Sequence, residues 1–306
     1  MNENNQFVRF DWAAKRMLRD KANFGVIEGL LTVLLGEKIT IDQILESESN
    51  QNSQDDKFNR VDIKALNSKG EIIIVEIQLT RQLYYLERIL FGVSKAITEH
   101  ITLGSKYDSV KKVYSISILY FDLGKGSDYL YHGKTSFVGV HTGDYLQVSS
   151  KEKDAISMRT PEEVFPEYYI IRVNEFNQIA TTPLEEWIAY LKDGSIREDT
   201  TAPGLAEARQ KLQYLKMSKK ERQDYDRHMD AIMTQNDVLD TAKMEGRAEG
   251  RVEGRAEGLA EGRAEGFAEG RAEEKFVLAQ GFKHAGTPLH VIAQVTGLSI
   301  DEIEKL

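Results

Sequence analysis

Two β-type segments separated by three turn residues constrain this chain more than any other feature of its sequence. The segments are FNRVDIKALN and EIIIVEIQL, and the turn is Ser68-Lys69-Gly70. A hairpin loop of this length commonly combines a type I turn with a left-handed residue, a conformation that glycine adopts without steric cost. The loop pairs Asn67 with Glu71, and this pairing sets the register of the whole hairpin.

The register predicts one apolar face and one mixed face, because successive side chains of a strand point to opposite sides. The mixed face places Asp62 opposite Glu76, with their Cβ atoms about 4.5–5.5 Å apart. Lys64 and Gln78 lie on the same face, where either side chain can hold a water molecule or a phosphate oxygen. The apolar face is expected to pack on a core and consists of Val61, Ile63, Ala65, Ile73, Val75 and Ile77.

Two carboxylates at this distance repel each other, so a raised pKa or a bound cation must offset the repulsion. Carboxylate oxygens, a backbone carbonyl and water form a hard oxygen site of the kind that Mg²⁺ or Mn²⁺ prefers. The alternative is a solvated strand face on which Asp62 pairs with Arg60 or Lys64. The sequence IIIVEIQL favours the cation, because an acid inside an apolar strand is costly unless it is paired or ligated.

The hairpin is flanked by segments with helical and strand patterns. A helix is predicted from about Asp11 to Leu35, with Asp11 as its N-cap and Gly36 as its stop. A short strand is expected at 39–46 and a polar loop at 48–57. The later elements are a long helix at 81–102, a strand at 111–121, strands and loops to about 175, and a helix that begins near Pro183.

Composition excludes several classes of function. The 306 residues include no cysteine, so the chain has no disulfides, thiolate metal sites or cysteine nucleophiles, as fits a reducing cytoplasm. A net charge of −9 argues against coating nucleic acid by bulk charge, although a local basic patch and a cation can still receive phosphate. No apolar run reaches the roughly 18 residues of a membrane span, and the N-terminus does not resemble a signal peptide.

At these residues the sequence resembles the PD-(D/E)XK nucleases, and more narrowly the Rpn family of recombination-promoting nucleases, or PD-(D/E)XK nuclease family transposases. The segments that carry the likeness are FDWAAKRML, with an Asp-x-x-x-Lys spacing, RVDIKA, IIIVEIQ, YYLERILFGVSKAI and KKVYSISILYF. Val61 replaces the motif proline, and Gln78 replaces the motif lysine. The resemblance implies a restriction-endonuclease-like α/β core, a mixed sheet flanked by helices, followed by a helical C-terminal tail.

The resemblance also implies roles for particular residues. Asp62 and Glu76 would bind Mg²⁺ or Mn²⁺ together with the carbonyl of Ile77, and Gln78 would orient the attacking water. Lys64 would supply the positive charge that Gln78 lacks and stabilise the phosphate.

Three further residues have two interpretations each. Arg88 either contacts the substrate phosphate or is a surface cation on its helix. Asp11 either contacts the substrate or caps the first helix. Glu28 is either a third acidic ligand or a solvated helix residue. Among the histidines, no pair has the spacing of a helical metal site.

These expectations favour a metal-dependent endodeoxyribonuclease that hydrolyses phosphodiester bonds of DNA, with a link to recombination or transposition that rests on the family resemblance. Two alternatives remain open. The chain is a catalytically weak DNA-binding or oligomeric assembly protein that retains the nuclease fold, or it is a helical scaffold organised by its C-terminal region. No membrane partner is expected.

A change of composition near residues 195–205 divides the chain. We expect a nuclease-like domain over 1–200, a charged helical linker over 201–244, a tetrapeptide repeat over 245–273 and a small helical element over 274–306. The last element resembles a helix-turn-helix, with Thr287 and Ser299 as N-caps and Gly286 and Gly297 as stops. Its acidic final helix favours docking over DNA recognition.

The repeat EGRAEGRVEGRAEGLAEGRAEGFAEG places a glycine at every fourth residue. In a helix these glycines form a slowly winding stripe, and each costs about 0.5–1 kcal/mol relative to alanine. Close packing against another helix would offset that cost. The sequence therefore favours a self-associating helix that makes the protein a homo-oligomer, with a loose linker as the alternative.

Overall fold

The computed structural model describes residues 7–16, 20–45, 62–101, 106–152 and 155–306. The chain divides into two units, Met1–Asp226 and Arg227–Leu306, which we describe separately. The predicted loop at 48–57, together with Arg60 and Val61, lies outside the described residues. In the described part of the chain, no helix has both the length and the apolar character that a membrane span needs.

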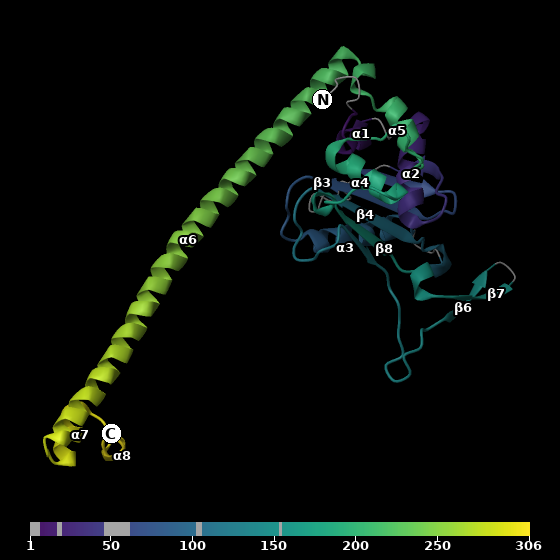
Figure 1. Cartoon of the computed structure of the whole chain (residues 1–306). Coiled ribbons are helices and arrows are strands. Elements are labelled where there is room, and N and C mark those ends of the chain that lie inside the picture. Colours follow the sequence, from purple (N-terminus) through teal and green to yellow (C-terminus); the bar gives the residue numbers. More distant parts are fainter. Residues whose placement is uncertain (1–6, 17–19, 46–61, 102–105, 153–154) are drawn as a thin grey trace, which may run out of the picture. The chain divides into compact units, whose positions relative to one another are not determined.

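A six-stranded mixed sheet forms the centre of the first unit, in the order β1-β2-β3-β4-β8-β5 (Figure 1). Strands β3, β4 and β8 are mutually parallel, whereas β1, β2 and β5 pair with antiparallel neighbours. A separate hairpin, β6–β7, lies between β5 and β8 in the sequence. The strands are β1 Ile41–Ile44, β2 Ile63–Asn67, β3 Ile72–Gln78, β4 Val113–Leu119, β5 Leu130–Gly133, β6 Val148–Glu152, β7 Ala155–Arg159 and β8 Glu167–Arg172.

The register that the sequence predicts for the central hairpin is confirmed. Lys64 pairs with Ile74 and Leu66 with Ile72, as the three-residue turn requires. Gly70 has a φ of 77°, the left-handed conformation expected at the end of the turn. The Gly70 N–H donates to the Asn67 carbonyl oxygen at 2.9 Å and closes the turn.

Helices cover both faces of this sheet (Figure 1). Helix α3, Tyr85–Glu99, packs its buried Val93 and Ala96 on Ile72 and Ile74 of β3. The other face is covered by α1, α2 and α4, whose largest buried side chains include Phe10, Leu30 and Trp187. These helices are α1 Phe10–Arg16, α2 Phe24–Leu35 and α4 Pro183–Asp193. Both faces of the hairpin are therefore covered, which explains why β3 is almost wholly apolar.

The single helix predicted from Asp11 to Leu35 is wrong, because the structure contains two. Helix α1 ends at Arg16, and a 3₁₀ turn at Lys21–Asn23 precedes α2. The Asp20 carboxylate accepts the Ala22 N–H at 3.0 Å and caps this turn, which starts a new element. Asp11 lies within α1 and is not its N-cap. Gly36 ends α2 in the left-handed conformation, as predicted.

The first compact unit continues past the change of composition near residue 200. Ala202, Leu205 and Leu212 are buried, and Tyr225 packs its ring against Trp12 of α1. Helix α5, Leu205–Lys211, lies on α2. The unit extends to Asp226. The sequence did not predict this extension, because the buried apolar residues are widely spaced among charged ones.

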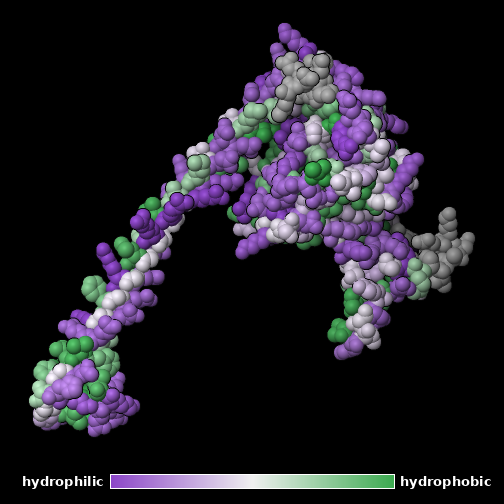
Figure 2. All heavy atoms as spheres, viewed as in Figure 1, coloured by the Kyte–Doolittle hydropathy of each residue, from purple (hydrophilic) through white to green (hydrophobic). Residues whose placement is uncertain are grey.

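Helix α6, Lys219–His284, is one continuous helix of 66 residues that contains the whole repeat (Figure 1). Hydrophilic residues cover most of its visible surface, with hydrophobic residues placed singly among them (Figure 2). The second unit ends in α7, Leu289–Thr296, and α8, Ile300–Glu304, which pack Ile292 and Ile303 on Ala279.

The predicted ends of these last helices are largely confirmed. Gly286 and Gly297 both have positive φ, and Ser299 caps α8 in a reciprocal arrangement with Glu302. The predicted cap at Thr287 is wrong. Helix α7 begins one residue later than that cap requires, after Pro288, which has no side-chain oxygen to cap it.

Candidate metal and active site

The hairpin brings Asp62 and Glu76 together at the end of β3. Strand β2 begins at Ile63, and the Asp62 carboxylate lies just before it. Its Oδ2 accepts the Ile77 N–H at 2.7 Å, so the side chain takes the place of a strand carbonyl beside β3. The charge of Asp62 adds to the effect of burial in raising the pKa of Glu76.

The acidic pair lies at the carboxyl end of the parallel strands, the usual location of ligand sites in sheets of this kind. Glu76 is directly beside Ser117 of β4 in the parallel register. Tyr85, the first residue of α3, is buried nearby, and burial followed by the charge of Glu76 raises the pKa of its hydroxyl well above the ordinary value. A phenol in this position stays neutral and remains a hydrogen-bond donor.

Glu76 is a buried acid with a direct cationic partner. Its exposed fraction is 7%, and its Oε1 lies 2.6 Å from Nη2 of Arg88. Burial raises the pKa of the Glu76 carboxyl, and Asp62 raises it further, whereas Arg88 lowers it. The net shift is upward, so the ion pair does not fully offset the cost of this site.

Asp62 also has a cationic neighbour, contributed by a different element. Nζ of Lys15, in the last turn of α1, lies 3.7 Å from Asp62 Oδ1. The Lys15 side chain is 47% exposed, whereas that of Asp62 is 14% exposed. Lys15 was not among the predicted site residues, although the Asp-x-x-x-Lys spacing of the first helix is the signal that marks it.

The donor atoms in this region suit a hard divalent cation. The N–H and C=O of one strand residue point to the same side, so the Ile77 carbonyl is directed toward the edge where its N–H meets Asp62. Two carboxylates and this carbonyl give an all-oxygen donor set, as Mg²⁺ and Mn²⁺ prefer. A cation would also offset the burial and the repulsion that together raise the pKa of Glu76. The residues present therefore fit the metal that the sequence predicts.

Gln78 and Lys64 lie on the same sheet face as Glu76 but have other contacts. The Gln78 amide donates to the Thr80 carbonyl oxygen at a long 3.3 Å. Nζ of Lys64 lies 2.5 Å from the carboxylate of Glu99, at the last turn of α3. Lys64 is buried and committed to this ion pair, so it does not contact the acidic pair directly. The catalytic roles of both residues stay predictions.

The two other acids that the sequence singled out contribute elsewhere. Asp11 is fully buried and pairs with Arg9 at 2.8 Å, and its role in binding substrate stays a prediction. Glu28 accepts the Ile41 N–H at 2.7 Å and holds the start of β1. Since the described residues contain no group of three acidic or histidine side chains placed to hold a metal, Glu28 does not join the acidic pair.

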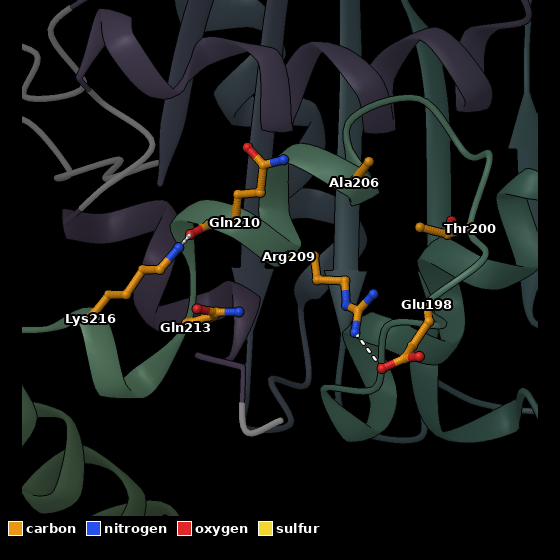
Figure 3. A pocket seen from close by; sticks show the side chains of 7 residues that line it. All are labelled: Glu198, Thr200, Ala206, Arg209, Gln210, Gln213 and Lys216. Carbon is orange, nitrogen blue, oxygen red and sulfur yellow. Dashed lines mark hydrogen bonds and ion pairs between the residues drawn. The ribbon is translucent and has the colours of Figure 1, made fainter. Parts of the chain in front are cut away.

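A polar pocket of about 330 Å³ lies beside α5 and shares no residue with the acidic pair (Figure 3). Its side chains include Arg209, which pairs with Glu198 at 2.9 Å, and Lys216, which donates to the Gln210 carbonyl. These cations are already engaged by the protein. The acidic pair, and not this pocket, is therefore the candidate active site.

A known protein family matches the part of the first unit that contains this candidate site. Residues 8–156 match the family model described as PD-(D/E)XK nuclease family transposase. The match includes α1, the hairpin with the acidic pair, α3 and β4. Comparison with curated proteins and with solved structures gave no match.

Proposed function

Because residues 8–156 belong to the PD-(D/E)XK nuclease family transposases, we propose that this chain is a divalent-metal-dependent endonuclease that hydrolyses the phosphodiester backbone of DNA. The observation that carries the proposal is the acidic pair, Asp62 and Glu76, held beside the Ile77 carbonyl. In a protein with a net charge of −9, Arg88 and Lys15, which pair with these acids, are nearby cations that can contact a phosphate.

Asp62, Glu76 and the Ile77 carbonyl would hold Mg²⁺ or Mn²⁺. Such a cation supplies Lewis acidity at the scissile phosphate and lowers the pKa of a water molecule. Gln78 lies two residues after Glu76 on the same face of β3, and its amide makes only a long contact with Thr80. The amide could therefore form a hydrogen bond with that water. Arg88 and Lys15 stabilise the negative charge that develops on the phosphate oxygens.

A second function is favoured by one observation, the absence of a lysine at the motif position. Gln78 has no charge to polarise the attacking water, and Lys64 is held by Glu99. This arrangement is compatible with a DNA-binding or assembly protein that retains the nuclease fold with weak chemistry. Such a protein would bind DNA through the same cations without cutting it.

Conversion of supercoiled plasmid to nicked circles separates the two functions. A nuclease nicks plasmid with Mg²⁺ or Mn²⁺ and not with EDTA, and Asp62→Ala or Glu76→Ala should lower the rate by roughly a thousandfold or more. Glu87→Gln, an exposed acid on α3, is the matched control and should retain activity. If the unaltered protein binds plasmid without nicking it, the second function holds. Preferential cleavage of an RNA of the same sequence would change the proposed substrate.

The proposed partners also include a second copy of this chain, bound through α6. Each residue of a helix advances by roughly 100°, so a four-residue repeat forms four slowly winding columns of side chains. Glycine lies between a glutamate column on one flank and a mainly arginine column on the other, and alanine lies opposite. The glutamates are Glu245, Glu249, Glu253, Glu257, Glu261, Glu265, Glu269 and Glu273, and the arginines are Arg247, Arg251, Arg255, Arg263 and Arg271.

These columns favour a parallel pair of helices. Residues 245–272 are all described, and none of their glutamates or arginines forms an ion pair within the chain. When two copies meet along the glycines, a parallel arrangement places the glutamate flank of one against the arginine flank of the other. An antiparallel arrangement places like charge against like charge. A Cβ built on any of the seven glycines meets nothing within 4 Å, so the stripe is open to a partner.

A further inference from the structure

Within the described part of the chain, each carboxylate of the acidic pair has a cationic neighbour. Glu76 holds Arg88 of α3 at 2.6 Å, and Asp62 holds Lys15 of α1 at 3.7 Å. The helices that carry these cations, α1 and α3, cover different faces of the sheet (Figure 1). Each cation therefore lies beside an acid whose negative charge it stabilises.

The contacts of Arg88 are divided between the site and a neighbouring loop. Its Nη2 contacts Glu76 Oε1, whereas its Nη1 donates to Gln82 Oε1 at 3.0 Å. Gln82 precedes α3 and is not one of the acids. If the contact with Glu76 is lost, the contact with Gln82 can keep the guanidinium beside the site.

Protein cation and metal compete for the same carboxylates. A divalent ion concentrates two charges on the acidic pair, and three neighbouring cations would then repel one another. The side chains of Arg88 and Lys15 are 33% and 47% exposed, so both can move toward solvent without leaving a buried charge. The acids, in contrast, are held by the hairpin backbone.

We propose that Arg88 and Lys15 are exchangeable counter-ions, which hold Glu76 and Asp62 in the metal-free protein and turn to the DNA phosphate when a divalent cation binds. This inference rests on the proposed nuclease function. It makes the two residues positioning groups before the metal binds and phosphate-binding groups afterwards. The chain thus releases its phosphate-binding cations only when the metal is in place.

The two cations are not equivalent competitors. The Arg88 contact is shorter, and its partner Glu76 is the more deeply buried acid. Removal of Arg88 should therefore change metal affinity more than removal of Lys15. If the cations exchange with the metal, loss of Arg88 should therefore strengthen metal binding more than loss of Lys15 does.

Calorimetric titration of the full-length protein with Mg²⁺ or Mn²⁺ tests the exchange without using activity. Arg88→Met should bind the metal about tenfold more tightly than the unaltered protein, and Lys15→Met about twofold more tightly. Arg81→Met, which removes an exposed cation of the same loop, should leave the affinity unchanged. The cleavage rate of Arg88→Met should fall about a hundredfold, opposite in sign to its metal affinity.

A second measurement on the unaltered protein follows the guanidinium of Arg88 directly by nuclear magnetic resonance. Addition of Mg²⁺ should change its side-chain N–H signals toward those of a solvated arginine, and Glu76→Gln should abolish the response. Arg88→Lys keeps the charge and should bind metal with an affinity near that of the unaltered protein. This variant is the control that separates the effect of the Arg88 charge from the effect of changing the side chain.

The outcomes distinguish the inference from the function on which it depends. If the unaltered protein binds metal and cuts DNA, but Arg88→Met binds metal with equal or weaker affinity, the exchange is wrong and the nuclease stands. Unchanged Arg88 signals at saturating metal lead to the same conclusion. If the unaltered protein neither binds metal nor cuts, the nuclease proposal itself is overturned and the exchange with it.

Discussion

Like charges lie close together both in the acidic pair of the first unit and in the repeat of α6, but the two regions differ in where the balancing positive charges lie. At the end of β3, two acids lie close together, and each has a cation of the same chain beside it. In the repeat, glutamates lie four residues apart along one column, and the arginines lie on the far flank. Like charges at this spacing destabilise a lone helix. The positive charges that would balance these glutamates would therefore come from a second chain.

The difference indicates where each region acts. Charges that are paired within a folded unit are positioned to a fraction of an ångström by the backbone, which suits chemistry on a phosphate. Charges arranged in columns on a helix specify the orientation of a second helix, with little demand on the position of any one side chain. The proposed catalysis therefore belongs to the first unit, and the proposed assembly belongs to the second.

Deletion of residues 243–306 is the largest change that tests this division. The truncated chain keeps the compact unit Met1–Asp226 and the first turns of α6. It should be a monomer by light scattering, whereas the full chain should be a dimer or larger. Its nicking rate per chain should stay within about threefold, because the acidic pair is intact.

Two results of this deletion would contradict the division. A truncated chain that still dimerises places the interface in the first unit. A truncated chain that is folded by circular dichroism but has lost all function favours the scaffold alternative, in which the repeat organises the protein and the core is passive.

Much of the first unit follows from local sequence. The turn Ser68-Lys69-Gly70 defines the hairpin register, and the register alone predicts that Asp62 and Glu76 are neighbours. The cap at Thr182, with Pro183 and Glu185, starts α4 where the sequence indicates. These features are local, because each depends on residues that are only a few positions apart.

Contacts between distant segments were not predictable in this way. The ion pair between Arg88 and Glu76, and that between Lys64 and Glu99, depend on how α3 lies across the sheet. The ion pair between Lys15 and Asp62 joins α1 to the start of β2, a contact that apolar periodicity does not reveal. The sequence therefore predicts the acids of the site and names Arg88 as a candidate, but it does not predict the ion pairs that Arg88 and Lys15 form with these acids.

Exchange of charge in the glutamate column sharpens the second half of the comparison. The triple variant Glu253→Arg, Glu257→Arg and Glu261→Arg makes both flanks of the glycine stripe positive. In a parallel pair each former attraction becomes a repulsion, so association should weaken roughly a hundredfold by analytical ultracentrifugation. High salt should reduce the difference, since the charges are exposed.

The complementary triple variant Arg251→Glu, Arg255→Glu and Arg263→Glu is the matched control. It should also self-associate weakly, and a mixture of the two variants should restore the affinity as a heterodimer. In an antiparallel pair the first variant only replaces glutamate pairs with arginine pairs. Unchanged association of that variant would therefore exclude the parallel arrangement.

The smallest expected effect compares a fully partnered acid of the first unit with an acid of the repeat. Glu185 accepts hydrogen bonds from Thr181 and Thr182 and from the side chain of Gln178, and the backbone N–H of Thr181 is the largest cause that lowers its pKa to about 2. A carboxyl whose pKa is depressed on folding stabilises the protein above its unfolded pKa and loses that contribution as the pH falls toward 2.

Glu185→Gln should therefore lower the free energy of unfolding by about 1 kcal/mol at pH 7, and the difference should shrink below about pH 4 in acid-dependent denaturant melts. Glu257→Gln, in the repeat, should leave the melts unchanged at every pH when the protein is diluted until its copies have dissociated. Under that condition, a loss equal to that of Glu185→Gln would show that the repeat has partners within its own chain.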